Sequence, residues 1–247
     1  MTFPVIFKTR LKSAGLSYSD KVLATETANL IAYWRLQEAS GSTADNYEGT
    51  AARDGEYTGV TLGQTGIGDG LTCPYFDGAN DYVDHYSTSL RDALDVDAGT
   101  LAIWAKVSGA GIWTDDAFHW ITSLRVDTNN YVQILKRNAA GNNELKAAYK
   151  AGGTEDGISL ATTPTDWFHI AITWDTTADE VKVYYAGSQQ GATQTGLGTW
   201  NGDIDEDWSN IGCLEETPSN VWDGYLAHCA VWTKALTAAQ ISSLASL

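Results

Sequence analysis

Three acidic residues in the stretch YFDGANDYVDHY, residues 75–86, are the first candidates for chemistry. Asp77, Asp81 and Asp84 lie within eight positions, and carboxylates that meet in space can act as general acid and base. Asp, Asn and Gly also tolerate the dihedral angles of tight turns. If CPYF and DYVDHY are consecutive strands, residues 77–81 are the loop between them and Asp84 faces solvent. We therefore predict a turn here and assign no catalytic residue.

Nine of the ten tryptophans of the chain divide by their surroundings. Five lie in apolar segments and are expected in the core, where a large ring buries much surface. These are Trp34, Trp104, Trp167, Trp174 and Trp232. Four others lie in segments rich in Gly, Asp and Asn and are candidates for exposed rings. These are Trp113, Trp200, Trp208 and Trp222.

Exposed rings beside carboxylates and amides are typical of sugar-binding sites. The ring stacks on the C–H face of a sugar, while polar side chains fix its hydroxyl groups. The expected polar partners are Asp115, Asp116, Asn201, Asp203 and Asp223. An alternative interpretation stays open, in which the four rings close the ends of the fold or contact a neighbouring subunit.

The elements that must position these residues are short strands. From about residue 29, apolar segments alternate with Gly/Asn/Asp/Ser turns, a spacing typical of a β-sandwich. No repeat with a period of about 20–50 residues is visible, which argues against a propeller or solenoid. Near the C-terminus, Thr237 and Gln240 have the spacing of a capping box and predict a short helix. It is the one good helix signal, and residues 21–247 are predicted to form a single domain.

Composition excludes several classes of function. The chain has 31 acidic and 15 basic residues and a net charge of −16, so its field repels nucleic acid. No apolar run approaches the roughly 20 residues that span a bilayer, so no membrane insertion is expected. The three cysteines lack zinc-site spacing and are expected to be buried thiols, and the four histidines lie near no nucleophile motif.

Several segments, in order, resemble the landmarks of one family. They are AYWRLQEASGSTADN, YFDGANDYVD, TLAIWAKV, DWFHIAITWD with EVKVYYAG, and IGCLEE with VWDGYLAHCAVWTKALTAAQI. Together they are similar to laminin-G-like domains of the concanavalin A-like lectin/glucanase superfamily, over about residues 29–247. The resemblance implies an all-β jelly-roll sandwich of two curved antiparallel sheets.

The resemblance also implies a calcium site, although the sequence matches only part of the family's calcium-binding pattern. Relatives often bind calcium at the sandwich rim through the acidic residue of an ADxSG segment, which matches Asp45, helped by an IDE segment in the last strand. Ala227 and His228 stand at the IDE positions here. Asp45 with Asn46 and Glu48 would supply only some of the six to eight oxygens that calcium takes. Calcium is the one cofactor that the sequence suggests.

Glucanases of the superfamily resemble one another in a Glu-x-Asp-x-Glu strand, which points two carboxylates about 5 Å apart into one cleft. The nearest match is GDIDEDWSN, where Asp203 and Asp205 alternate but Glu206 and Asp207 follow directly in a loop-like context. We therefore expect a non-enzymatic structural or binding module with a lectin-like fold. A free carbohydrate-binding lectin is the alternative, and a glycoside hydrolase is the next.

Residues 1–20 are predicted to form an extended N-terminal arm. Its apolar residues alternate weakly and can add a strand to a partner's sheet edge, while its basic residues either stay solvated or dock on an acidic neighbour. The arm residues in question are Phe3, Val5, Phe7, Lys8, Arg10 and Lys12. The short apolar stretch precedes the charges, the reverse of a signal peptide, so we expect synthesis in the cytoplasm.

The segments YSDKVLATETANLIAYWRL and DGYLAHCAVWTKALTAAQI are similar to those of laminin-G-like proteins of tailed-bacteriophage virions. This resemblance implies a virion surface component, such as a capsid decoration, fibre or tail protein. The arm would then contact other virion proteins, and the sandwich would face outward, in some cases toward host glycans. Outside a virion, an extracellular location is expected, and a homo-oligomer stays open.

Overall fold

A computed structural model describes residues 16–139 and 142–247. Its first element is the helix α1 (Tyr18–Ala24). The predicted anchoring residues lie before it, outside the described residues. These are Phe3, Val5, Phe7, Lys8, Arg10 and Lys12.

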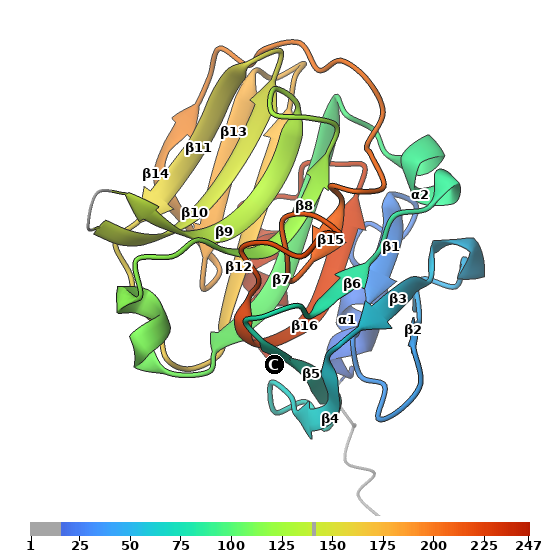
Figure 1. Cartoon of the computed structure of the whole chain (residues 1–247). Coiled ribbons are helices and arrows are strands. Elements are labelled where there is room, and N and C mark those ends of the chain that lie inside the picture. Colours follow the sequence, from blue (N-terminus) through green and yellow to red (C-terminus); the bar gives the residue numbers. More distant parts are fainter. Residues whose placement is uncertain (1–15, 140–141) are drawn as a thin grey trace, which may run out of the picture.

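Two antiparallel sheets of eight strands each lie face to face (Figure 1). In spatial order, sheet A contains β14 (Ser188–Gln194), β13 (Glu180–Tyr185), β12 (Phe168–Asp175), β7 (Ala98–Val107), β16 (Asp223–Trp232), β5 (Thr72–Asp77) and β4 (Thr61–Thr65), with β1 (Leu30–Trp34) also paired to β16. Sheet B contains β11 (Thr154–Leu160), β10 (Asn142–Ala151), β9 (Tyr131–Ala139), β8 (His119–Arg125), β15 (Asn210–Ile211), β6 (Tyr82–Asp84), β3 (Gly55–Thr58) and β2 (Thr43–Ala44). The predicted all-β sandwich is confirmed.

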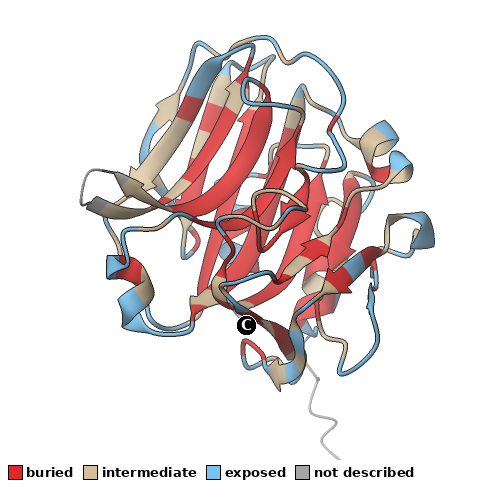
Figure 2. Cartoon of the chain, in the orientation of Figure 1, coloured by how far each residue is buried: buried red, intermediate tan, exposed pale blue. Residues whose placement is uncertain are grey.

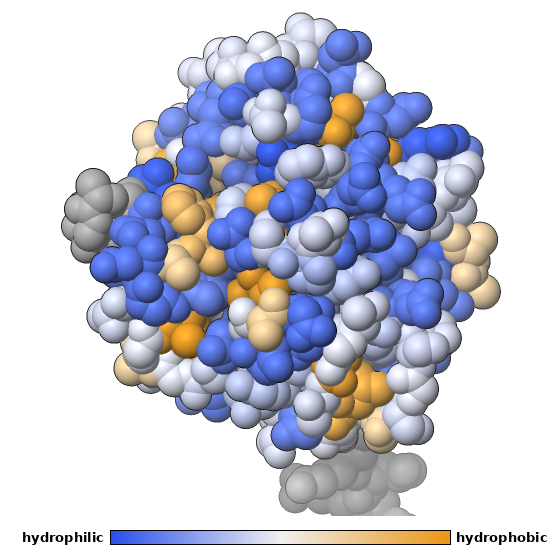
Figure 3. All heavy atoms as spheres, in the orientation of Figure 1, coloured by the Kyte–Doolittle hydropathy of each residue, from blue (hydrophilic) through white to orange (hydrophobic). Residues whose placement is uncertain are grey.

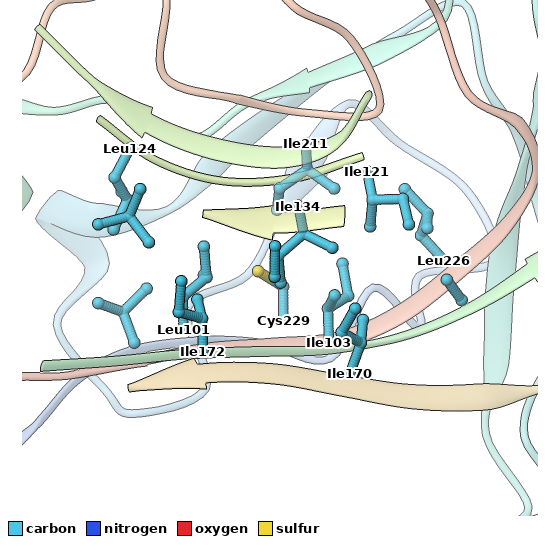
Figure 4. Packing of buried hydrophobic residues seen from close by; sticks show 14 of the residues in the cluster. Leu101, Ile103, Ile121, Leu124, Ile134, Ile170, Ile172, Ile211, Leu226 and Cys229 are labelled. Carbon is cyan, nitrogen blue, oxygen red and sulfur yellow. The ribbon is translucent and has the colours of Figure 1, made fainter. Parts of the chain in front are cut away.

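The main core fills the space between the sheets. Because side chains alternate along a strand, Leu101 and Ile103 of β7 point toward Ile121 of β8 and Ile134 of β9 (Figure 4). Each such side chain contributes about 1.5–3 kcal/mol when it is fully buried. Alternate residues of these strands therefore form the main core.

A second core covers the outer face of sheet A. It packs α1 and α3 (Ala238–Leu244) against outward residues of the central strands, among them Trp104 and Trp232. These strands are consequently buried on both faces, as the red central strands of Figure 2 show. This double burial explains why β7, β12 and β16 read as nearly continuous apolar runs.

The helix α1 was not predicted, and the expectation of a single good helix signal at the C-terminus is wrong. Ser17 and Asp20 form a capping box at its start. The hydroxyl of Tyr18 donates to the carbonyl of Leu244 at 2.8 Å and accepts from Trp104 Nε1 at 2.8 Å. These bonds join α1 to α3 and to β7.

Three other short helical segments connect strands. They are α2 (Thr88–Ala93) and two 3₁₀ turns, Ala51–Arg53 and Ala110–Thr114. The predicted C-terminal helix is confirmed as α3, with the capping box of Thr237 and Gln240 in place.

The turn predicted between β5 and β6 is confirmed. Asp77 Oδ1 accepts from the Ala79 N–H at 2.9 Å, and Gly78 has a φ of +78°. Asp81 Oδ2 accepts from the Asp77 N–H at 2.9 Å. Asp84 lies opposite Val83 along β6, as predicted, but is half-buried rather than solvent-facing. The acidity of this stretch is therefore used to build a turn.

The surface is mostly hydrophilic on the face shown in Figure 3, with hydrophobic residues in small patches. Within residues 16–139 and 142–247, no helix has the length and apolar character needed to cross a membrane.

Candidate functional site

Two of the four tryptophans expected at the surface are core residues. Trp113 is 2% exposed and Trp222 is fully buried. The indole Nε1 of Trp113 donates to the carbonyl of Pro164 at 2.8 Å, which seats the ring under that segment. The expectation that these two rings are exposed is wrong, because both rings pack into the main core while most of their polar neighbours stay at the surface.

Asp115, expected beside a sugar, belongs instead to an ion-pair cluster around a buried lysine. Its Oδ1 accepts from Lys136 Nζ at 2.5 Å, and its Oδ2 lies 2.7 Å from His119 Nε2. Lys136 itself has no solvent exposure. Burial raises the pKa of Asp115, but hydrogen bonds from Lys136, the Ala117 N–H and His119 outweigh it and hold that pKa below its ordinary value. Asp115 is thus committed to neutralising Lys136.

The other candidates keep separate partners. Trp200 is half-buried with its ring 5.8 Å from that of Tyr149, and Trp208 is half-buried with the Arg125 guanidinium 4.6 Å from its ring. Asp116, Asn201 and Asp203 are exposed. No two of the four candidate tryptophan rings are in contact in the described part of the chain.

The residues suggested for calcium do not fit that ion. Asn46 Oδ1 already accepts from the Tyr33 N–H at 2.8 Å, and its Nδ2 donates to Glu48 Oε2 at 3.3 Å. Glu48 also lies 3.9 Å from Arg53 Nη1, and Asp45 stands exposed beside them. Among the described residues, no three His, Cys, Asp or Glu side chains gather as metal ligands.

His228, at one of the positions of the family's IDE segment, has a structural role. It lies at a bulge in β16 with φ +55°, buried on the outer face of sheet A. Its Nε2 lies 3.1 Å from Asp69 Oδ2, and its Nδ1 lies 2.7 Å from the Tyr33 hydroxyl. This position therefore serves the second core rather than a rim cation.

Strand register instead builds an aromatic row that sequence reasoning missed. Tyr225 of β16 pairs with Tyr75 of β5 on one side and with Lys106 of β7 on the other. Phe168 pairs with Ala105, so Trp167, one residue before β12, continues the row beside Lys106. The next residues along these strands, Phe76, Leu226 and Phe168, face the main core. Since side chains alternate along a strand, the aromatic row lies on the outer face of sheet A.

A groove runs over this row. It lies toward the β4/β5 edge of sheet A. Its volume is about 410 Å³. It is lined by Gln64, Thr65, Gly66, Lys106, Ser108, Trp167 and Tyr225. We call these residues, with the adjoining Tyr75, the aromatic groove.

The rings of the aromatic groove are all partly exposed. The Tyr75 and Tyr225 ring centroids are 5.1 Å apart, and those of Trp167 and Tyr225 are 6.4 Å apart. The Tyr225 ring plane is inclined by 44° to that of Tyr75 and by 56° to that of Trp167, so the three rings do not form one flat surface. Trp167, predicted in the core, only borders the second core and offers part of its ring to the groove.

Polar atoms surround these rings. Lys106 Nζ lies 3.7 Å from Asp166 Oδ1, and the Tyr75 hydroxyl donates to Asp223 Oδ1 at 3.5 Å. Partial burial, and then the charge of Asp223, raise the pKa of Tyr75, so its hydroxyl stays protonated and able to donate. Of the predicted polar candidates, Asp223 alone adjoins this groove.

One acidic pair adjoins the groove. Asp223 pairs in register with Asp77, so two carboxylates face each other across β16 and β5. Asp77 is exposed, and its Oδ1 already accepts from the Ala79 N–H. The groove thus combines stacking surfaces, hydrogen-bonding groups and carboxylates, which is the chemistry that polyhydroxylated molecules need.

Comparison with protein families gives one match, over residues 77–242, to the concanavalin A-like lectin/glucanases superfamily. The chain belongs to this superfamily. Comparison with curated proteins found no significant match.

Solved structures share the fold of this superfamily member at low identity. Domain 4 of an extracellular arabinanase from Geobacillus stearothermophilus, solved in complex with arabinotriose, matches with a TM-score of 0.56 and 17% identity over 88% of this chain and 98% of that domain. The botulinum neurotoxin serotype D binding domain matches with a TM-score of 0.56 and 12% identity, over 88% of this chain and 51% of its own.

A Trypanosoma rangeli sialidase, in complex with a difluoro sugar acid, matches with a TM-score of 0.65 and 13% identity. This match covers 98% of our chain but 35% of the sialidase. The chain therefore spans nearly all of the arabinanase domain, about half of the toxin domain and about a third of the sialidase. At these identities the likeness establishes the fold.

Proposed function

We propose that the chain is a non-catalytic carbohydrate-binding module that holds a short neutral oligosaccharide in the aromatic groove. The observation that carries the proposal is the row of three partly exposed rings, Tyr75, Tyr225 and Trp167, aligned across neighbouring strands beside Lys106. The arabinotriose complex of the arabinanase domain supports it, because that domain has the same fold.

The charges of the groove favour a neutral sugar. Lys106 faces Asp166, and Asp223 borders the aromatic row, so carboxylates outnumber the one ammonium. The whole chain carries a net charge of −16, which also repels an anionic ligand. Neutral hydroxyl groups avoid this repulsion. They can accept hydrogen bonds from Lys106 and can exchange them in either direction with Gln64 and Ser108.

The size of the effect follows from the apolar area that a sugar covers. A sugar that covers roughly 60–80 Å² of one ring removes it from water at about 25 cal/mol per Å², about 1.5–2 kcal/mol. A loss of that size lowers affinity roughly ten- to thirty-fold. Removal of either Trp167 or Tyr225 should therefore be visible in a binding assay.

The test is a screen of immobilised glycans with the wild-type chain and with Trp167→Ala and Tyr225→Ala. Trp208→Ala is the matched control, because that ring is also half-buried but lies beside Arg125, away from the groove lining. We expect both groove variants to lose binding and the control to keep it. Binding by all variants, or loss in the control alone, would reject the groove as the site.

A glycoside hydrolase is the second candidate, favoured by the Asp77 and Asp223 pair. We favour binding because a general acid that works near neutral pH is generally desolvated, whereas Asp77 is exposed. Incubation of every bound glycan with the wild-type chain and with Asp223→Asn separates the candidates. New reducing ends that require Asp223 would establish hydrolysis, and intact glycan would favour the binding module.

We further propose display of this module on a virion surface, supported by the resemblance of residues 18–36 and 223–241 to laminin-G-like phage proteins. Deletion of residues 1–15, which precede α1, should then leave a folded domain that no longer enters particles. Mass spectrometry of purified particles measures this. Incorporation of the shortened chain at the wild-type level would argue against an anchoring arm.

A further inference from the structure

A second pocket lies on the outer face of sheet A, at the opposite edge from the aromatic groove. Its volume is about 370 Å³, within the range of small-molecule sites. It is lined by Thr173, Asp175, Glu180, Lys182, Tyr184, Gln189 and residues 235–238. We call it the acidic pocket. The strands β12, β13 and β14 form its floor, and the segment that leads into α3 forms one wall.

The charges of the acidic pocket are unbalanced. Asp175 and Glu180 are directly paired across β12 and β13, and like charges at such positions destabilise a sheet. Lys182, two positions along the same face, places its Nζ 2.5 Å from Glu180 Oε2. Among the lining residues Lys182 carries the one ammonium group, and it pairs with Glu180, so the charge of Asp175 is not neutralised within the pocket. Asp175 Oδ1 accepts from the Ala178 N–H at 2.9 Å.

An organic ammonium ion fits this charge better than a metal ion does. A hard divalent cation takes six or more oxygens, and among the described residues no group of three His, Cys, Asp or Glu is arranged to hold one. Lys182 already shows an ammonium group held against Glu180 in the same pocket. A second ammonium group beside Asp175 would relieve the repulsion between the paired carboxylates.

The uncharged residues that line the pocket indicate which other chemical groups the ligand carries. Tyr184 and Thr173 are buried in the floor, and Gln189 pairs in register with Tyr184 at its edge. Leu236 and the two alanines of the wall offer a small apolar surface. A molecule with a primary amine, a few hydrogen-bonding groups and a C–H face matches this lining.

We propose that the acidic pocket binds a small primary ammonium ion, with Asp175 as its counter-ion and Lys182 as an internal competitor. The site is independent of the aromatic groove and of the proposed sugar binding there. Two sources share this chemistry, an amino sugar and an aliphatic diamine.

The test is an NMR titration of the full chain with glucosamine and with 1,4-diaminobutane, with glucose and N-acetylglucosamine as uncharged controls. We expect at least one amine to shift the amides of residues 173–184 and both controls to leave them unchanged. Glucosamine binding alone identifies the amino sugar, and diaminobutane binding alone identifies the aliphatic amine. No amine-dependent shift, or an equal shift with glucose, would overturn the proposal.

Two variants are expected to change the affinity for the amine in opposite directions. Asp175→Asn removes the counter-ion and should weaken amine binding about fivefold or more, since one charge at about 4 Å contributes about 1 kcal/mol even in water. Lys182→Met removes the competing ammonium and should tighten binding by a similar factor. Weakening by Lys182→Met, or no effect of Asp175→Asn, would contradict the assignment. Trp167→Ala should leave amine binding unchanged, so failure here and failure of the groove are separate results.

Discussion

The ion pair between Asp115 and Lys136 allows a test of two possible roles of Asp115, which are sugar binding and stabilisation of the fold. If Asp115 held a sugar, its loss would reduce binding and leave the fold intact. In the structure it neutralises a fully buried lysine, with Lys136 Nζ 2.5 Å from Asp115 Oδ1. Removal of one partner from a buried pair leaves an uncompensated charge, which costs about 3–5 kcal/mol.

We expect Asp115→Ala to lower the free energy of unfolding by about 3 kcal/mol, the low end of that range, because the Asp115 side chain is 30% exposed. Guanidinium unfolding at pH 7, followed by circular dichroism, measures the change. Asp116→Asn is the control, since that neighbour is exposed and asparagine tolerates its φ of +55°, and it should change stability by less than about 0.5 kcal/mol. The additional change Lys136→Met should recover much of the loss, because it removes the orphaned charge.

The effect should also depend on pH. The folded state holds the pKa of Asp115 below its ordinary value, so its contribution is present above the unfolded pKa of about 3.9. That contribution is lost as the pH falls through the lower, folded pKa. The difference in the free energy of unfolding between wild type and Asp115→Ala should therefore become smaller in strong acid. If that difference is under about 1 kcal/mol at pH 7 and Asp115→Ala abolishes sugar binding, this reasoning is refuted.

Three further predictions concern stability. Burial, and then the charge of Asp84, raise the pKa of Glu216 from 4.5 to about 7, so the folded chain binds the extra proton between these values and stability should fall as the pH rises through them. Glu216→Gln should remove part of that fall, by no more than about 1 kcal/mol because the group is partly exposed, and by less in high salt; pH-dependent thermal unfolding measures it. Trp222→Ala should cost about 3–5 kcal/mol in denaturant unfolding, since the ring is fully buried, and a cost below about 1 kcal/mol would contradict its place in the core. Ser17→Ala removes the cap of α1 and should cost about 1 kcal/mol, with faster hydrogen exchange in residues 18–24 as the local readout; unchanged exchange would contradict the role of the cap.

The sandwich could be predicted because its information is local. Alternating apolar segments report a half-buried strand, and a capping box reports a helix start within four residues. Residues 77–81 identify a turn for the same reason. The capping box at Ser17 carried an equally local signal for α1, which the prediction of an arm over residues 1–20 overlooked.

The site could not be predicted because its information is nonlocal. Trp113 and Trp222 have polar neighbours in the sequence, yet their rings point into the core, so the composition around a ring does not report its burial. Trp167 has apolar neighbours, yet it ends a row that exists only through the register of several strands. Asp115 meets Lys136 from 21 positions away.

The measurement that tests the proposed function most directly is an NMR titration of the wild-type chain with a neutral oligosaccharide found in the glycan screen, with the sugar analysed afterwards. We predict saturable shifts at Tyr75, Lys106, Trp167 and Tyr225, with the sugar recovered intact. Shifts confined to residues 200–208, no saturable shift, or a cleaved sugar would contradict the account of a non-catalytic aromatic groove.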